Sequence, residues 1–337
     1  MALGRGFTLV ELMVSIFIGG LLLGGAFELN MAFNRQTIRQ QHVVDMQQTL
    51  RITRQVIERV VRGAGAGLQD TSLSANTCGG APNLYYPFQF SNSNTFSDPK
   101  NTFDSTPSDS DQDADWLRVV NVGAGTNASS DDGSKLCVAS TSGFVVGDIV
   151  AIINTDPSRP QSCLRSLTSL GTACPGNAPS LSHASASSCL NQPPIGDPCL
   201  SNMTWPAPIR RITGNTTQFR IDTSDASTPR LMVSYTDITR APQWQVLAEN
   251  LEDLQVAMVM ADGRVCGNAG NSVDDPALCS PPQLRSVRFT ISARSSVPIP
   301  GFPPGSRGGS EDLPASSVSD GFLRRSVTTL VQLRNQP

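Results

Sequence analysis

Residues 7–27 read FTLVELMVSIFIGGLLLGGAF, and this stretch decides the fold of the chain. It holds a single charged residue, Glu11. At a rise of 1.5 Å per residue, a helix of this length spans roughly 30 Å, which is the hydrocarbon thickness of a bilayer. The stretch therefore predicts a transmembrane helix.

The residues before this run, MALGRG, differ from an ordinary secretory signal peptide. The small-residue site, Gly6, precedes the apolar run, whereas a signal peptide has its cleavage site after the run. Arg5 keeps the N-terminus cytoplasmic by the positive-inside rule. The sequence therefore predicts that the bulk of the chain lies on the other side of the membrane.

Cysteine usage agrees with an exported chain. Eight cysteines occur, all of them after residue 77, and there is no C-x-x-C pair. His42 and His183 are not placed to complete a zinc site, so disulfides in an oxidising compartment are expected, with no metal. Eight cysteines allow about 105 pairings. Short closed loops favour Cys163–Cys174, Cys189–Cys199 and Cys266–Cys279, which leaves Cys78 for Cys137.

The helix is expected to continue beyond the membrane, because residues 28–62 contain neither proline nor glycine. Residues 63–67, GAGAG, then end it. A helix over residues 7–62 would be about 84 Å long. Two rows of residues spaced by seven predict the seam that packs on the globular part: Val43, Leu50 and Ile57, and Met46, Thr53 and Val60. The arginines, interpreted as a solvated basic face, are Arg35, Arg39, Arg51, Arg54, Arg59 and Arg62.

After residue 67 the pattern changes to short β-type runs separated by Ser, Asn, Gly and Pro. Residues 161–208 are rich in Ser, Pro and Cys, and we interpret them as a long loop insertion pinned by disulfides. Residues 244–254 suggest a helical turn. The predicted strands are 116–122, 136–139, 144–153, 218–221, 231–235, 254–260, 284–293 and 326–333.

Composition and motifs argue against nucleic-acid binding and catalysis. A net charge of −3 gives no field that attracts nucleic acid. His183 has no acidic neighbour in its loop and is expected to be exposed; no nucleophile motif or cofactor motif is present. Asp109, Asp111, Asp113 and Asp115 alternate. The glycine and glutamate of an EF-hand are missing, so they are interpreted as a solvated acidic turn.

Glu11 is the residue that simple anchoring does not explain, because a carboxylate in a membrane helix is expensive and usually has a partner. If the chain is cut after Gly6, an ammonium forms on Phe7 and Glu11 becomes the fifth residue. The cation of one subunit would then neutralise the carboxylate of its neighbour as helices bundle. The sequence Gly6-Phe7-Thr8-Leu9-Val10-Glu11-Leu12 resembles the prepilin signature of type IV pilins and type II secretion pseudopilins.

This resemblance implies cleavage after Gly6 by a prepilin peptidase, N-methylation of Phe7 and a role for Glu11 in subunit docking. The whole chain resembles the large PilW-like minor pilins, strongly over the first 62 residues and weakly beyond them. The implied fold is α+β and pilin-like, with the long helix packed on an antiparallel sheet. The implied parts are a leader (1–6), the helix (7–62) and a β-rich exported domain (63–337).

The function expected from the resemblance is structural: a minor pilin that primes type IV pilus assembly or sits at the pilus tip. Expected partners are the other minor pilins, the major pilin, the prepilin peptidase, the inner-membrane assembly platform and a pilus-tip adhesin. The subunit would lie in the inner membrane and then in the pilus at the cell surface. A minor pseudopilin of a type II secretion system is the alternative. The third reading, a membrane-tethered periplasmic enzyme or binding module, lacks a catalytic constellation.

Overall fold

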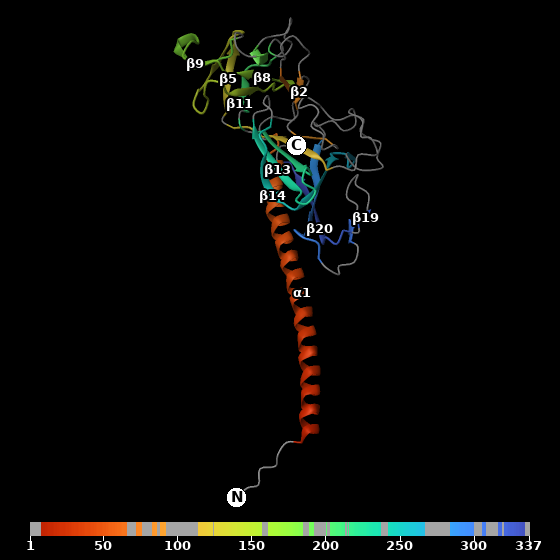
Figure 1. Cartoon of the computed structure of the whole chain (residues 1–337). Coiled ribbons are helices and arrows are strands. Elements are labelled where there is room, and N and C mark those ends of the chain that lie inside the picture. The colour runs from red at the N-terminus through yellow and green to blue at the C-terminus, as the bar shows by residue number, and fades with distance from the viewer. Residues whose placement is uncertain are drawn as a thin grey trace.

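The computed structural model describes residues 8–65, 72–75, 83–85, 88–91, 114–123, 125–156, 161–184, 189–191, 200, 203–212, 214, 216–236, 242–266, 284–299, 305–307, 316–318 and 320–333. It confirms an α+β chain in which one long helix joins antiparallel sheets. Figure 1 shows the helix as a rod whose C-terminal part enters the β-rich body.

The helix α1 spans Leu9–Arg62 without a break, close to the predicted 7–62. It ends at Gly63, whose N–H bonds to the carbonyls of Val60 and Val61. A Cβ on Gly63 would lie 2.8 Å from the Asn121 side-chain oxygen. Gly65 has a φ of 66° and donates its N–H to the Val120 carbonyl, 3.1 Å away. The positive φ therefore favours glycine at position 65, where the chain turns from the helix towards the sheets.

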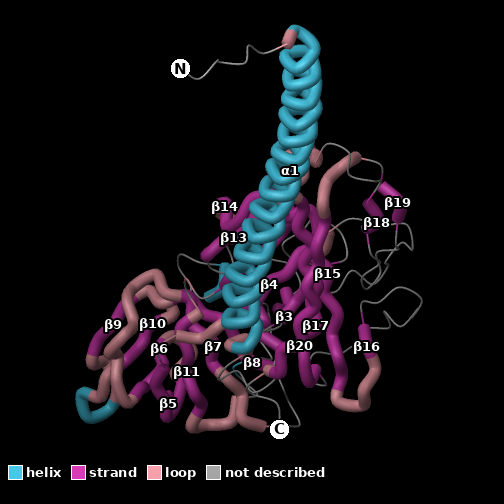
Figure 2. Tube along the Cα trace, turned by 90° about the horizontal axis from the view of Figure 1, so that it is seen from below, coloured by secondary structure: helices cyan, strands magenta, loops and turns pink. Residues whose placement is uncertain are grey.

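The C-terminal half of α1 buries the predicted seam. The buried residues are Met46, Leu50, Thr53, Ile57 and Val61, and Val43 and Val60 pack beside them. Figure 2 shows this half crossing the strands of two sheets. Their buried side chains join those of the helix in one core. Burial of this apolar stripe is what holds the helix on the body.

Two sheets make up this core. The five-stranded sheet has the order β14 (Gln245–Glu249), β13 (Arg230–Thr236), β12 (Thr216–Asp222), β4 (Trp116–Val120) and β3 (Phe88–Ser91). The four-stranded sheet has the order β16 (Val265–Cys266), β15 (Leu251–Met260), β17 (Leu284–Arg294) and β20 (Arg324–Gln332). All pairings within both are antiparallel.

Asp115 ties these two sheets together. Its N–H donates to the Leu254 carbonyl of β15 at 2.7 Å, and its carboxylate accepts the N–H of Val256. The residue is fully buried. The prediction of a solvated acidic turn is therefore wrong for Asp115, because the carboxylate replaces a backbone acceptor at a sheet junction. Asp109, Asp111 and Asp113 lie outside the described residues.

A third sheet forms a separate lobe, which we call the distal lobe because it lies at the end of the body farthest from the N-terminus (Figure 1). Its order is β2 (Asn83–Tyr85), β1 (Ser72–Ala75), β8 (Gln161–Ser166), β7 (Ile149–Ile152), β11 (Ala207–Arg211), β5 (Gly125–Asp131), β6 (Lys135–Val138), β10 (Ser180–Ser182) and β9 (Ser169–Gly171). Only β1 and β8 pair in parallel among these described strands.

Strands β5 to β11 of the distal lobe lie between β4 and β12, which are neighbours in the five-stranded sheet, whereas β1 and β2 come from the segment between α1 and β3. The lobe has two apolar clusters of its own, centred on residues such as Ile209 and Ile153. Val120, the last residue of β4, belongs to the second cluster. The lobe thus has its own apolar clusters and adjoins the end of one core strand.

The structure corrects three expectations about secondary structure. Residues 161–208 are not one long loop, since they contain β8, β9, β10 and the start of β11. Residues 144–148 form a turn, in which Asp148 accepts the Val145 N–H at 2.8 Å, and the strand begins at Ile149. Residues 244–254 hold β14 and the start of β15 instead of a helical turn. Short hairpin strands, β18 (Gly305–Arg307) and β19 (Ser316–Val318), also occur.

The disulfide between Cys137 and Cys174 overturns two predicted pairs, Cys163–Cys174 and Cys78–Cys137. Strand β10 pairs with β6 so that Ser180 lies opposite Cys137, which brings the chain before β10 next to β6. The two Cα atoms are 5.6 Å apart. Tertiary pairing, and not loop length, therefore selects the partner.

Cys163 and Cys266 are also disulfide-bonded, to cysteines outside the described side chains. The predicted pairs Cys189–Cys199 and Cys266–Cys279 each include a cysteine outside the described residues, Cys199 or Cys279, and they stay predictions.

Arg324 fixes the start of β20. It donates from Nε to Glu252 Oε1 of β15 at 2.7 Å and from Nη1 to Asp320 Oδ1 at 2.8 Å. Its side chain is only 10% exposed. Hydrogen bonds from Arg324 lower the pKa of Asp320 to about 2 and raise that of Arg324. This cluster joins two strands that are separated by β17 in the sheet order.

Replacing Cys137 by serine should destabilise the distal lobe. Residues 137 and 174 are 37 apart in sequence, and a bridge over such a loop contributes about 4 kcal/mol in the chain-entropy model. Urea unfolding of the full chain in detergent measures the loss. The double variant Cys137→Ser/Cys174→Ser, which leaves no spare thiol, should unfold like the single variant. Recovery of a Cys163–Cys174 peptide without reduction would contradict the structure.

The cluster at Arg324 should make stability depend on acid. Because the pKa of Asp320 is lowered to about 2, its contribution is complete above the unfolded value near 4 and is lost as the pH falls towards 2. Asp320→Asn should therefore be less stable than wild type at pH 6, with a difference that shrinks between pH 5 and 2. Asp45→Asn, at an exposed site of α1, is the control. A difference that does not change with pH would refute this role.

Candidate functional site

The start of α1 is a capping box built from Thr8 and Glu11. The Glu11 N–H donates to Thr8 Oγ1 at 3.2 Å, while Glu11 Oε2 accepts the Thr8 N–H at 3.0 Å and the Thr8 hydroxyl at 2.9 Å. Thr8 has the extended backbone of a helix N-cap, with φ −79° and ψ 149°. The pattern Thr-x-x-Glu before an apolar run is the sequence signal for this motif.

The capping box gives Glu11 a partner within its own chain. Thr8 is thus a partner of Glu11 in addition to the Phe7 ammonium that the sequence predicts. A carboxylate in the first turn is also stabilised by the helix dipole. Cleavage after Gly6 would place an ammonium on Phe7, one residue before this cap. The Glu11 carboxylate would then accept hydrogen bonds from Thr8 and could also pair with an ammonium. Gly6 and Phe7 themselves lie outside the described residues.

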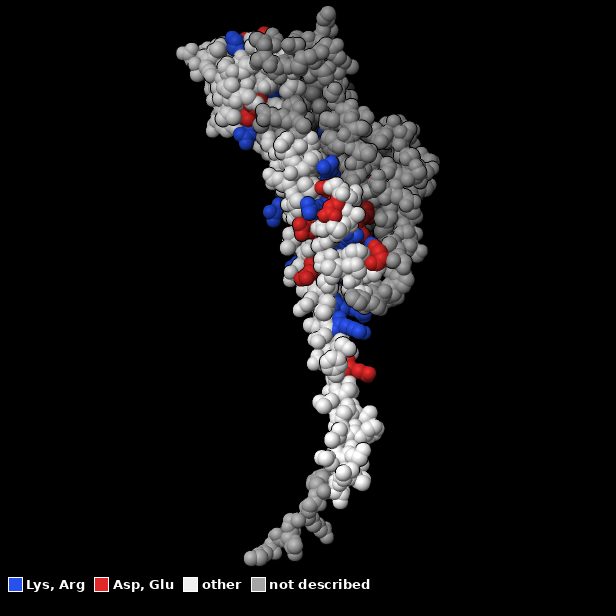
Figure 3. All heavy atoms as spheres, in the orientation of Figure 1, with Lys and Arg blue, Asp and Glu red and all other residues white. Residues whose placement is uncertain are grey.

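The first half of α1 exposes apolar side chains on all sides. Leu9, Phe17, Leu22 and Leu23 are each between 69% and 74% exposed. It is the one helix in the described chain that is long and apolar enough to cross a membrane, and none of its most apolar window is buried. In Figure 3 this part of the rod carries almost no charge. Such a surface requires either lipid or other apolar helices around it.

The predicted basic face follows the apolar half. Five of its six arginines are exposed, and Arg54 is partly buried against the body. Arg62 forms an ion pair with Glu58 one turn away. Arg51 and Arg54 line a groove between the helix and β20. Most of this face is therefore solvated, as expected. The groove that Arg51 and Arg54 line was not indicated by the sequence.

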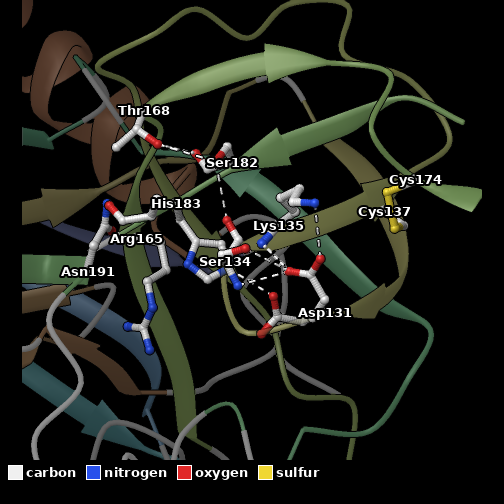
Figure 4. A network of polar contacts seen from close by, with 12 residues as sticks. Asp131, Ser134, Lys135, Cys137, Arg165, Thr168, Cys174, Ser182, His183 and Asn191 are labelled. Carbon is white, nitrogen blue, oxygen red and sulfur yellow. Dashed lines mark hydrogen bonds and ion pairs between the residues drawn. A yellow bond between two sulfur atoms is a disulfide. The ribbon is translucent and has the colours of Figure 1, made fainter. Parts of the chain in front are cut away.

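His183 is buried and not exposed, which corrects the expectation for the Cys-rich segment. Its Nε2 lies 2.9 Å from Asp131 Oδ1, and the histidine is only 2% exposed. Figure 4 shows the pair among Ser134, Lys135 and Ser182 in the distal lobe. Asp131 is 52 positions away, so no local pattern announced it. No serine or cysteine side chain of the described residues hydrogen-bonds to His183. The His183–Asp131 contact is therefore interpreted as a bond that holds the distal lobe together.

Metal ligation finds no support among the residues that the structure describes, which contain no group of three or more His, Cys, Asp or Glu side chains suited to an ion. His42 lies on α1, partly exposed. The features with a clear chemical character are therefore the cap at Glu11 and the exposed apolar helix that follows it.

Comparisons with known proteins agree with this geometry. Residues 1–27 match the model of the prokaryotic N-terminal methylation motif. The chain has a prepilin-type N-terminus. Comparison with the curated proteins gave no match. A solved type IV-like pilin from Thermus thermophilus is similar at 13% identity over 57% of this chain and 86% of that chain, with a TM-score of 0.25. So low a score carries nothing about the arrangement of the sheets.

The motif match and the helix geometry concern the same residues. The matched segment holds the Thr8–Glu11 cap and the exposed apolar run that begins at Leu9. These features are those of a component of a pilus or pseudopilus, and they fit anchoring in a membrane by the N-terminal helix.

Proposed function

We propose that the chain is a minor pilin that takes part in priming a type IV pilus. The observation that carries the proposal is the apolar, exposed half of α1 headed by Glu11 within an N-terminal methylation motif. Before assembly, lipid covers this half; in a filament, the equivalent helices of other subunits cover it. The partners are accordingly other minor pilins and the major pilin, together with the peptidase and the assembly platform in the inner membrane.

Processing links the two environments. Cleavage after Gly6 and methylation of Phe7 would leave a cation near the Thr8–Glu11 cap. A carboxylate at the bilayer centre costs about 2.5–3.5 kcal/mol on insertion scales, and Glu11, in the first turn of the helix, carries part of that cost. Thr8 meets part of this cost in the single subunit by two hydrogen bonds. The charge itself remains to be neutralised, and the Phe7 ammonium of a neighbouring subunit is the group that does so.

The distal lobe supports a place at the far end of the filament. This lobe extends the subunit at the end opposite to its N-terminus (Figure 1). Subunits in a filament of parallel helices stack along that same direction, so a bulky lobe there hinders the seating of another subunit beyond it. We therefore place the chain at the pilus tip, with its C-terminal part exported, where an adhesin is a suitable companion.

Variants at the helix start separate charge from capping. Glu11→Gln keeps an oxygen that can accept from Thr8 but removes the charge; Thr8→Ala weakens the cap and keeps the charge. We expect Glu11→Gln to lower co-purification with the other minor pilins and to reduce filament number, and Thr8→Ala to leave both near wild type. Export and processing should be intact in both variants.

The readouts are co-purification from membranes and filament counts by electron microscopy, with gold label against the distal lobe. Label confined to filament ends supports the tip position, and label along the length refutes it. Assembly of Glu11→Gln and Glu11→Ala at the wild-type level would exclude Glu11 as a docking group. Failure of Glu11→Ala alone would show that capping, and not charge, is what assembly needs.

A further inference from the structure

A groove of about 420 Å³ lies where the C-terminal half of α1 meets the start of β20. Leu50 and Val327, which belong to or pack against the main core, supply its apolar lining. Its polar lining comes from Gln47 and Ser326 and from three arginines, Arg51, Arg54 and Arg325. The helix provides one wall and the first residues of the strand provide the other.

The three arginines of this groove have no carboxylate partner among the described residues. The neighbouring Arg324 shows the contrast, because Asp320 and Glu252 both bind it. Arg54 Nε is in addition buried without a hydrogen-bond partner in the described part of the chain. Three like charges beside an apolar strip repel one another, and a bound anion would relieve both this repulsion and the unsatisfied donor.

The position of the groove along the helix excludes lipid phosphates as the bound anion. Arg51 lies 24 residues beyond Phe27, the end of the predicted membrane segment, and this corresponds to about 36 Å of helix. The headgroup layer adds only about 5–8 Å to each side of the hydrocarbon core. While the helix is anchored, lipid phosphates therefore do not reach the groove.

We propose that the groove receives an acidic segment of a neighbouring subunit, with carboxylates on the arginines and an apolar side chain against Leu50 and Val327. This inference rests on the proposed function, since it takes the neighbour to be another subunit of the same assembly. The groove lies beside α1, the element through which such subunits would approach. Arginine suits this role because its guanidinium binds carboxylates in a bidentate manner.

A photo-crosslinking residue in place of Gln47 tests the proposal in the full chain within cells that assemble filaments. The expected adduct joins a peptide of another pilin that carries at least two Asp or Glu residues. Arg51→Glu/Arg325→Glu should lower its yield about tenfold by reversing two of the three charges. Arg59→Glu, an exposed change on the same helix outside the groove, is the matched control and should leave the yield unchanged.

Thermal unfolding shows whether each variant folds. If Arg51→Glu/Arg325→Glu does not fold, the milder pair Arg51→Gln/Arg325→Gln replaces it in the cross-linking experiment. Lysine at the cross-linked carboxylates of the neighbour should restore the yield with Arg51→Glu/Arg325→Glu. A lipid adduct, an adduct that charge reversal leaves unchanged, or no adduct in chains that start at Phe7 would overturn the groove proposal alone. Chains that do not start at Phe7 would overturn the proposed function instead.

Discussion

The whole structure depends on one constraint: a single helix must be stable in two different environments, one around its exposed apolar half and one in the core of the body. Over its first half α1 exposes large apolar side chains, and no described part of the chain covers them. Over its second half the apolar residues narrow to a single stripe, and the two core sheets bury that stripe. Because the helix has no break between these halves, whatever surrounds the first half also fixes where the body stands.

The body is arranged around the end of this helix. Gly63 and Gly65 turn the chain closely against the end of β4, and Asp115 at the start of β4 binds β15. One strand therefore connects the helix terminus, the five-stranded sheet and the four-stranded sheet. Strands β5 to β11 of the distal lobe lie between β4 and β12 in the sequence, and β1 and β2 join the lobe from the segment that follows the helix. The groove lies at β20, the edge strand of the four-stranded sheet, where this strand meets the helix.

The helix was predictable because its signals are local: an apolar run, a long stretch without proline or glycine, a heptad seam and a glycine cluster. The capping box was equally visible in Thr8-x-x-Glu11 and was overlooked. Strands β9 and β10 are three residues long, too short for alternation to show, so the distal lobe looked like a loop. The Cys137–Cys174 bridge and the His183–Asp131 pair depend on how distant strands meet, and loop length or neighbouring residues cannot reveal that.

The central claim is that this membrane helix is converted into a filament helix by removal of the leader before Phe7. Its most direct test is the N-terminus of the protein recovered from filaments sheared off the cell surface, determined by mass spectrometry. The account predicts a single start at Phe7 with a methylated amine, one residue before the Thr8–Glu11 cap. A chain that retains Met1 in the filament fraction, or one that begins after Phe27 and has lost the apolar helix, would contradict it.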